Sequence, residues 1–119
     1  MTVSPVASEL LSKINERRVL EFVQRNGPAS RAVMARGSGM SAPTVSKAVV
    51  SLIRNGFLEE TEASEAGFGR PGKLLQLSEH KANVLGVVID AEACWIGSAR
   101  LDGAVAEEQS ISFSTPKSY

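Results

Sequence analysis

MSAPTVSKAVVSLIRNGFLEE, at residues 40–60, contains a helix start, an apolar helical stripe and a stop signal. Ser41 suits the N-cap position, and Pro43 falls in the first turn, where its missing N–H leaves no helical hydrogen bond unmade. Apolar side chains then recur at helical spacing: Val45, Val49, Leu52 and Ile53. The spacing predicts a helix with one buried face that ends at Asn55-Gly56.

Two further helices are predicted before this one. The segment SELLSKINERRVLEFVQRNG, residues 8–27, has Ser8 as a candidate N-cap and ends at an Asn-Gly-Pro turn. Its apolar residues lie near helical spacing: Leu11, Ile14, Val19, Phe22 and Val23. The segment SRAVMARGSG, residues 30–39, opens with a capping Ser30 and meets Gly37 and Gly39 after about two turns. A helix, a short helix, a Gly-containing turn and a longer helix predict helix-turn-helix geometry.

The front of the third predicted helix carries short polar side chains and a lysine. Thr44, Ser46 and Lys47 are interpreted as a polar face opposite Val45 and Val49. In a helix-turn-helix, the N-terminal residues of the second helix of the pair contact base edges, and the N–H groups there suit phosphates. Capping alone would account for Ser41 and Thr44, but not for Ser46 and Lys47.

The charge distribution favours a polyanionic partner for the first half of the chain. The formal net charge of the 119 residues is zero, yet residues 1–58 carry eight basic and three acidic side chains, a net of +5. Residues 59–119 carry the opposite excess, −5, and no acidic residue lies between Phe22 and Leu58. Nucleic acid would be attracted to the first half. A solvated face with a local charge bias is the alternative.

Two short strand-like runs follow the third helix. FLEETEA, residues 57–63, and KLLQLSE, residues 73–79, are separated by the Gly-containing loop SEAGFGRPG. A hairpin in this place makes the domain a winged helix, and Arg70 at the loop tip suits the minor groove. The alternative for Arg70 is an ordinary exposed turn. Because four glutamates would repel phosphate, only the tip is expected to touch DNA: Glu59, Glu60, Glu62 and Glu65.

Composition excludes several classes of protein. With 43% apolar and 22% charged residues, the chain is neither disordered nor fibrous, and it has no apolar run long enough for a membrane span and no signal peptide. Cys94 is the single cysteine and His80 the single histidine, so disulfides and a metal site are not expected. We expect a cytoplasmic protein without a cofactor, a metal or catalytic residues.

Three segments together resemble the ROK family of transcriptional repressors. They are VLEFVQRNGPASRAVMARGSGMSAPTVSKAVVSLIRNGFLEE at residues 19–60, GRPGKLLQL at 69–77 and VLGVVIDAEACWIGSARLDGAV at 84–105. The resemblance implies an α+β fold: a winged helix-turn-helix domain over residues 1–80, and over 81–119 the opening β-meander of a sugar-kinase-like domain with an actin-like ATPase fold. It also implies operator binding through the third helix and the wing. The expected DNA-binding residues are Arg31, Ser41, Ala42, Pro43, Thr44, Ser46, Lys47 and Arg70.

The predicted meander departs from the pattern of active sugar kinases in the resembled family. Val88 stands where those kinases have an aspartate, and Asp90-Ala91-Glu92 stand where they have the glycines that cradle phosphate. Kinase activity is therefore not expected. Cys94 and Trp95 are predicted to be core residues, and Asp102 is predicted to serve a tight Asp-Gly turn.

The predicted function is that of a sequence-specific DNA-binding transcriptional regulator that represses sugar-related genes. A fragment of a sugar kinase and a winged-helix protein-interaction module are the alternatives. Double-stranded DNA is the expected partner; a sugar effector is expected only for a longer form, and so is a homodimer. The apolar stripe of residues 8–27 should be consumed by the domain's own core, so this chain alone is expected to be mostly monomeric.

Overall fold

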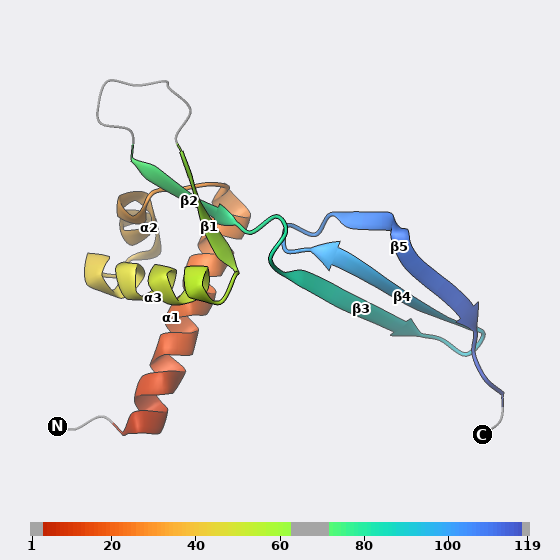
Figure 1. The fold of residues 1–119 in the computed structure, drawn as a ribbon. Helices are drawn as coiled ribbons and strands as arrows, with labels where there is room; N and C mark the ends of the chain where they lie inside the picture. The colour runs from red at the N-terminus through yellow and green to blue at the C-terminus, as the bar shows by residue number, and fades with distance from the viewer. Residues whose placement is uncertain (1–3, 63–71, 118–119) are drawn as a thin grey trace. The chain divides into compact units, whose positions relative to one another are not determined.

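The computed structural model describes residues 4–62 and 72–117, with the side chains of residues 106–108 excepted. The chain divides into two compact units, Met1–Ser78 and Glu79–Tyr119. The first contains α1 (Pro5–Asn26), α2 (Arg31–Ser38), α3 (Ala42–Arg54), β1 (Leu58–Glu62) and β2 (Lys73–Leu77) (Figure 1). The second contains β3 (Asn83–Ile89), β4 (Ala93–Arg100) and β5 (Val105–Ser114). The predicted α+β class, with a winged helix followed by a meander, is confirmed.

Helix α1 begins earlier than its sequence pattern indicates. Ser4, not Ser8, is the N-cap: its Oγ accepts a hydrogen bond from Ala7 N at 3.2 Å, and Ser8 N donates to Ser4 O at 3.0 Å. The predicted Ser8 cap is wrong because Ser4 followed by Pro5 at the first helical position is a complete start signal one turn upstream. The helix therefore extends over 22 residues.

The caps predicted for the two shorter helices are confirmed. Ser30 Oγ accepts from Val33 N at 3.3 Å, and Ser41 Oγ accepts from Thr44 N at 3.4 Å. Helix α2 passes through Gly37 and ends at Ser38, and Gly39 then adopts the left-handed conformation at φ +70°. Gly37 thus does not stop the helix.

Gly37 serves close packing between α1 and α2. A Cβ built at this position would overlap Cε2 of the Phe22 ring, closer than real Cβ contacts come. The absence of a side chain on Gly37 therefore lets the Phe22 ring lie against α2.

One hydrophobic core is shared by the helices and the hairpin of the first unit. It comprises Val19, Val23, Ala29, Met34, Met40, Val45, Ala48, Val49, Leu52, Leu58 and Leu75. From α1 only Val19 and Val23 are buried, whereas Leu11 is 54% and Ile14 46% exposed. The prediction that the core consumes the whole apolar stripe of α1 is therefore wrong, because the N-terminal half of the helix extends past the core.

Strand β2 is hydrogen-bonded on both sides. It pairs antiparallel with β1, with Leu58 opposite Leu77 and Glu60 opposite Leu75. On its other side Leu75 exchanges two hydrogen bonds with Ala29, in the loop before α2, at 2.9 and 3.1 Å. The base of the hairpin is thereby tied to the start of α2.

The second unit is an antiparallel sheet in the order β3-β4-β5. Asp102 serves the predicted turn: its Oδ1 accepts from Ala104 N at 2.9 Å, and Gly103 has φ +87°. Cys94 is buried, at 6% exposure, but Trp95 is 46% exposed, so the prediction of Trp95 as a core residue is wrong. Successive residues of a strand point to opposite faces, and only one of these two faces is covered at this position.

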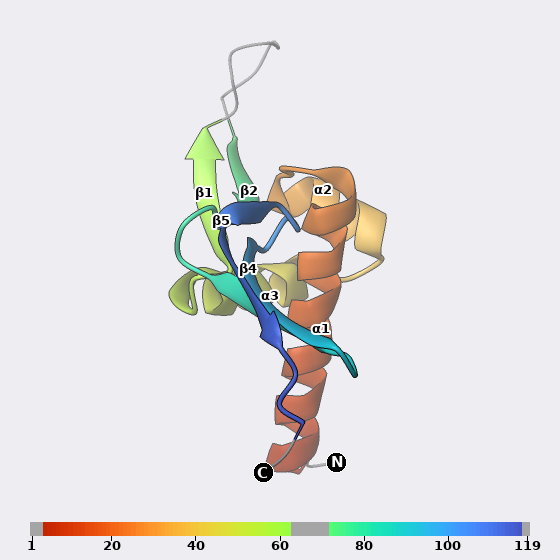
Figure 2. The ribbon, with the colours of Figure 1, turned by 90° about the vertical axis from the view of Figure 1, so that its right-hand side faces the viewer.

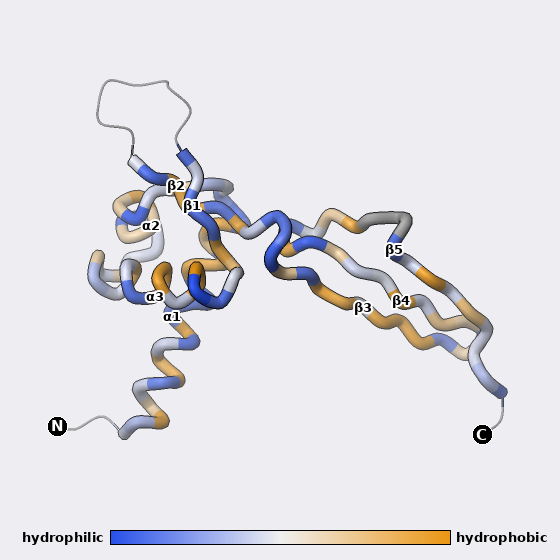
Figure 3. The backbone as a smooth tube through the Cα atoms, in the orientation of Figure 1, coloured by the Kyte–Doolittle hydropathy of each residue, from blue (hydrophilic) through white to orange (hydrophobic). Residues whose placement is uncertain are grey.

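Apolar side chains are exposed along much of this sheet. Figure 3 shows hydrophobic residues along β3 and β4. The largest exposed members are Val84, Leu85, Val87, Val88, Ile89, Trp95, Val105, Ile111 and Phe113. Across the described ranges, no helix is long and apolar enough to cross a membrane.

Candidate nucleic-acid interface

Helix α3 has a buried face and an exposed face at helical spacing. Its buried residues are Val45, Ala48, Val49 and Leu52. At 100° per residue, the opposite side is occupied by Pro43, Lys47, Val50 and Arg54, all of them exposed. This exposed face carries two cations and no carboxylate.

The predicted site residues of α3 occupy different parts of its surface. Lys47 lies at the centre of the exposed face, whereas Thr44 and Ser46 are half-buried at its two edges. Ser41 and Ala42 are exposed at the N-terminal end, as is Pro43 in the first turn. The three polar residues therefore do not form one continuous face, because two positions along a helix correspond to a rotation of about 200°.

The Thr44 hydroxyl is engaged with the helix cap. Thr44 Oγ1 lies 2.7 Å from Ser41 Oγ, and Ser41 Oγ also accepts from Thr44 N. This pair fixes the rotamers of both side chains at the start of α3. Any base contact by Thr44 would use the remaining hydrogen-bonding capacity of a hydroxyl that is already oriented.

Two residues of the exposed face were not among the sequence-predicted contacts. Val50 is 59% exposed and Arg54 is exposed one turn further along α3. Pro43, Lys47, Val50 and Arg54 follow the spacing i, i+4, i+7 and i+11. These four residues lie on the side of the helix opposite the apolar stripe. Helical periodicity in the sequence could therefore have predicted Val50 and Arg54 as exposed residues.

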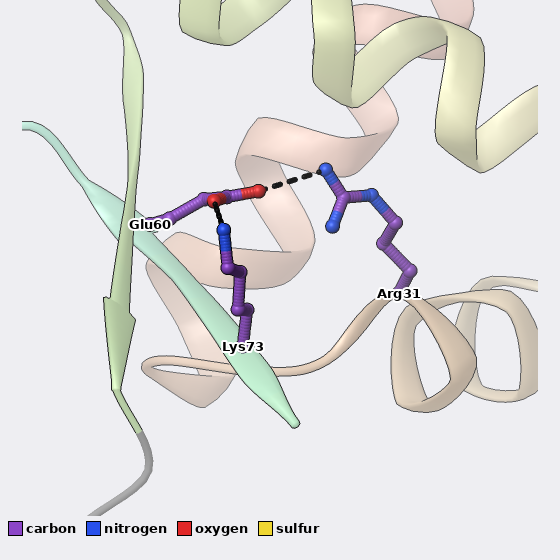
Figure 4. A network of polar contacts seen from close by, with 3 residues as sticks. All are labelled: Arg31, Glu60 and Lys73. Atoms are coloured by element: carbon purple, nitrogen blue, oxygen red, sulfur yellow. Dashed lines mark hydrogen bonds and ion pairs between the residues drawn. The ribbon is translucent and has the colours of Figure 1, made fainter. Parts of the chain in front are cut away.

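Arg31 forms an ion-paired network with the base of the hairpin (Figure 4). Its Nη2 donates to Glu60 Oε1 at 3.2 Å, and Lys73 Nζ donates to Glu60 Oε2 at 2.8 Å. The three residues come from α2, β1 and β2. The Lys73 hydrogen bond, and after it the Arg31 hydrogen bond, hold the pKa of the Glu60 carboxyl below its ordinary value.

The network weakens the repulsion between the glutamates of the wing and DNA that the sequence predicts. Glu60 is compensated by two cations, and Glu59 Oε1 accepts a hydrogen bond from Gln76 Nε2 at 2.9 Å. Repulsion of a DNA backbone at the hairpin base is therefore weaker than the count of glutamates implies. The predicted contact Arg70 and the loop residue Glu65 lie outside the described residues.

The turn between β3 and β4 is hydrogen-bonded within itself and to Thr115, which follows β5. Asp90 Oδ1 accepts from Ala91 N at 2.6 Å, and Asp90 O accepts from Thr115 Oγ1 at 2.6 Å. A carboxylate therefore occupies the N–H that a phosphate-cradling turn would offer to its ligand. Among the described residues, no group of three or more His, Cys, Asp or Glu side chains is arranged to hold a metal ion.

Part of the first unit is similar to a known family of proteins. Residues 13–67 match the MarR family, whose match covers the helix-turn-helix and β1. Most of the chain is similar to the crystal structure of a ROK family transcriptional regulator, a homolog of the E. coli Mlc protein. The TM-score is 0.66 at 26% sequence identity, covering 87% of this chain and 26% of that one. The resemblance to ROK-family transcriptional regulators is confirmed.

A curated relative shows how much of a longer protein this chain matches. The uncharacterized protein y4fQ of Sinorhizobium fredii is 31% identical over 111 residues, which cover 93% of this chain and 28% of y4fQ. The chain thus spans about a quarter of the length of this relative and of the ROK regulator. The MarR-type winged helix and the likeness to a ROK regulator favour a DNA-binding transcriptional regulator over an enzyme.

Proposed function

We propose that this chain is a sequence-specific DNA-binding element of a transcriptional regulator, with α3 in the major groove of double-stranded DNA. The exposed face of α3 carries the proposal. It offers Lys47 and Arg54 as cations and Val50 as an apolar contact for a thymine methyl group, on a helix whose N-terminus lies at a tight turn.

The proposed contacts keep the sequence-based set and extend it. Ser41, Ala42, Pro43, Thr44, Ser46 and Lys47 lie at the front of α3, Arg31 lies at the start of α2, and Arg70 belongs to the wing. Val50 and Arg54 join them because they share the exposed face with Lys47. Arg70 would follow the minor groove, whose potential is most negative where it is narrow.

The regulatory direction is proposed to be repression of sugar-related genes. The support is the chain's likeness to a ROK family transcriptional regulator, together with the sugar-kinase-like domain that the sequence resemblance implies. A bound winged helix that overlaps a promoter would exclude polymerase. A reporter whose promoter contains the selected site should lose expression when the chain is produced.

Selection of bound sequences from a random duplex pool tests the central proposal. The expected result is one enriched motif, bound much more tightly than a scrambled duplex of the same length. The affinity should fall steeply with salt, because phosphate contacts release counterions. A chain that enriches no motif and shows no salt-dependent affinity for any duplex would contradict DNA recognition and favour a protein-interaction module.

A further inference from the structure

A groove between α1 and α3 lies beside the proposed reading face. It has a volume of about 200 Å³, and its polar lining comes from Ser8, Ser12 and Asn15 of α1 and from Thr44 and Lys47 of α3. Every one of these side chains can donate a hydrogen bond, and Lys47 is the only charged residue in the lining. The groove therefore suits an anion whose oxygens accept hydrogen bonds.

The polar residues of α1 that line the groove continue, past the core, the helix face that is buried at Val19 and Val23. Ser8, Ser12 and Asn15 continue the line of Val19 and Val23 at steps of three or four residues. Val19 and Val23 are buried, but beyond Val19 the stripe changes to hydroxyl and amide side chains. Past the core this stripe lies beside the front of α3, where Ser12 and Asn15 are half-buried and Ser8 is exposed, so its hydroxyl and amide groups are accessible to a polar ligand.

The Thr44 hydroxyl is paired with Ser41 Oγ, but the three donors from α1 are not engaged with neighbouring residues. Among the described residues, the side chains of Ser8, Ser12 and Asn15 make no hydrogen bond within the chain. Two carboxylates adjoin lining residues in sequence: Glu9, which is exposed, and Glu16, which accepts from Ser51 Oγ at 2.8 Å and lies 3.7 Å from Lys13 Nζ. The Glu16 carboxylate is therefore already engaged with Ser51 and Lys13.

The groove lies on the side of α3 away from the hairpin. In Figures 1 and 2, which share a vertical axis, β1 and β2 rise on one side of α3 and the first half of α1 descends on the other. A helix in the major groove is flanked by two phosphate backbones. The hairpin side would face one backbone and the α1 side the other.

Resting on the proposed function, we propose that this groove binds a backbone phosphate of the DNA duplex, on the flank of the major groove opposite the wing. Ser12 and Asn15 donate hydrogen bonds to its oxygens, and Lys47 supplies the positive charge. Lys47 is then a phosphate contact and not a base contact. The N-terminal half of α1 thereby belongs to the DNA interface.

Phosphate-ethylation interference on a duplex selected from the random pool tests this assignment. The wild-type chain should show interference at a phosphate on the flank opposite the wing. The double variant Ser12→Ala with Asn15→Ala should lose that position alone, with affinity reduced about tenfold, since hydrogen bonds to charged groups are the stronger ones. Leu10→Ala, on the exposed outer side of the same helix, is the matched control and should retain both the pattern and the affinity.

Two further measurements make the test decisive. Lys47→Met should lower the slope of log K against log salt by about one, as the loss of one phosphate contact requires. An unchanged interference pattern in the double variant, with DNA still bound, would overturn the inference and leave the proposed function standing. Absence of binding by the wild-type chain to any duplex would overturn both.

Titration of the chain with inorganic phosphate distinguishes a backbone phosphate from a free one. Because the duplex supplies the other contacts, phosphate alone should bind too weakly to detect. Measurable binding of inorganic phosphate that the double variant loses, with DNA affinity unchanged, would identify a small-anion site and overturn the assignment to DNA.

Discussion

Arg31 and Glu60 lie 29 positions apart in the chain, yet the guanidinium of one donates to the carboxylate of the other at 3.2 Å. This contact links the first residue of α2 to β1, and Lys73 adds a second donor from β2. The helix-turn-helix and the base of the wing are therefore connected through one carboxylate.

The Glu60 network predicts a pH dependence of stability. The two hydrogen bonds lower the pKa of Glu60 in the folded chain, so its contribution is present above the carboxyl's ordinary pKa and is lost as pH falls towards the lowered value. Glu60→Gln should remove this part of the acid dependence, measured by thermal unfolding at a series of pH values. Glu62→Gln, on the same strand, is the control. Identical pH profiles for the two variants would contradict the assignment.

Replacement of Lys47 by alanine is expected to weaken binding to the selected duplex by roughly 1–3 kcal/mol. A phosphate contact predicts the same loss on every sequence, whereas a base contact predicts relaxed specificity at one position. Affinities measured for a set of single-base variants of the motif separate the two. Lys117→Ala removes a charge in the second unit and is the control, which should leave the affinity for DNA nearly unchanged. If the Lys47 variant binds the duplex as tightly as wild type, the proposed contact is refuted.

Arg70→Ala is expected to reduce the preference for A·T-rich flanks while leaving the fold intact, because a narrow minor groove attracts arginine. Binding competition between duplexes with A·T-rich and G·C-rich flanks measures the preference, and circular dichroism checks the fold. If the wild type and the variant rank the flanks alike, the wing makes no contribution to specificity.

The packing of Phe22 on Gly37 predicts an energetic coupling between the two positions. In a Phe22→Ala background, Gly37→Ala should stabilise the chain by about 0.5–1 kcal/mol through helix propensity. In the wild-type background the new Cβ would displace the ring, so the gain should be cancelled or reversed. Chemical denaturation of the four chains gives the coupling, expected to be about 1 kcal/mol or more. Additive effects would show that the ring moves aside at no cost.

The helices and strands could be predicted from local signals. Ser30 and Ser41 cap α2 and α3, and Asp102 closes the turn between β4 and β5, because each acts within three residues of its own position. The same reasoning missed the Ser4 cap of α1, since Ser8 also precedes an apolar periodic run. Local rules do not rank two acceptable caps one turn apart.

The candidate site was less predictable because it depends on contacts between distant segments. The ion pair of Arg31 with Glu60 and the groove of Asn15 with Lys47 join residues about 30 positions apart. The exposure of Trp95 likewise depends on what covers a sheet face, which alternation along one strand cannot specify. The exposure of Val50 and Arg54 could have been predicted from helical periodicity, because they lie opposite the buried stripe of α3.

The two hydrogen bonds between Leu75 and Ala29 also bear on how the first unit opens. With β1 on one side and the loop before α2 on the other, β2 cannot separate from the fold without breaking both pairings. The wing base and the start of α2 should therefore open together as one cooperative unit. Amide protons of Ala29 and Leu75 should exchange with solvent deuterium at one common rate, set by that shared opening.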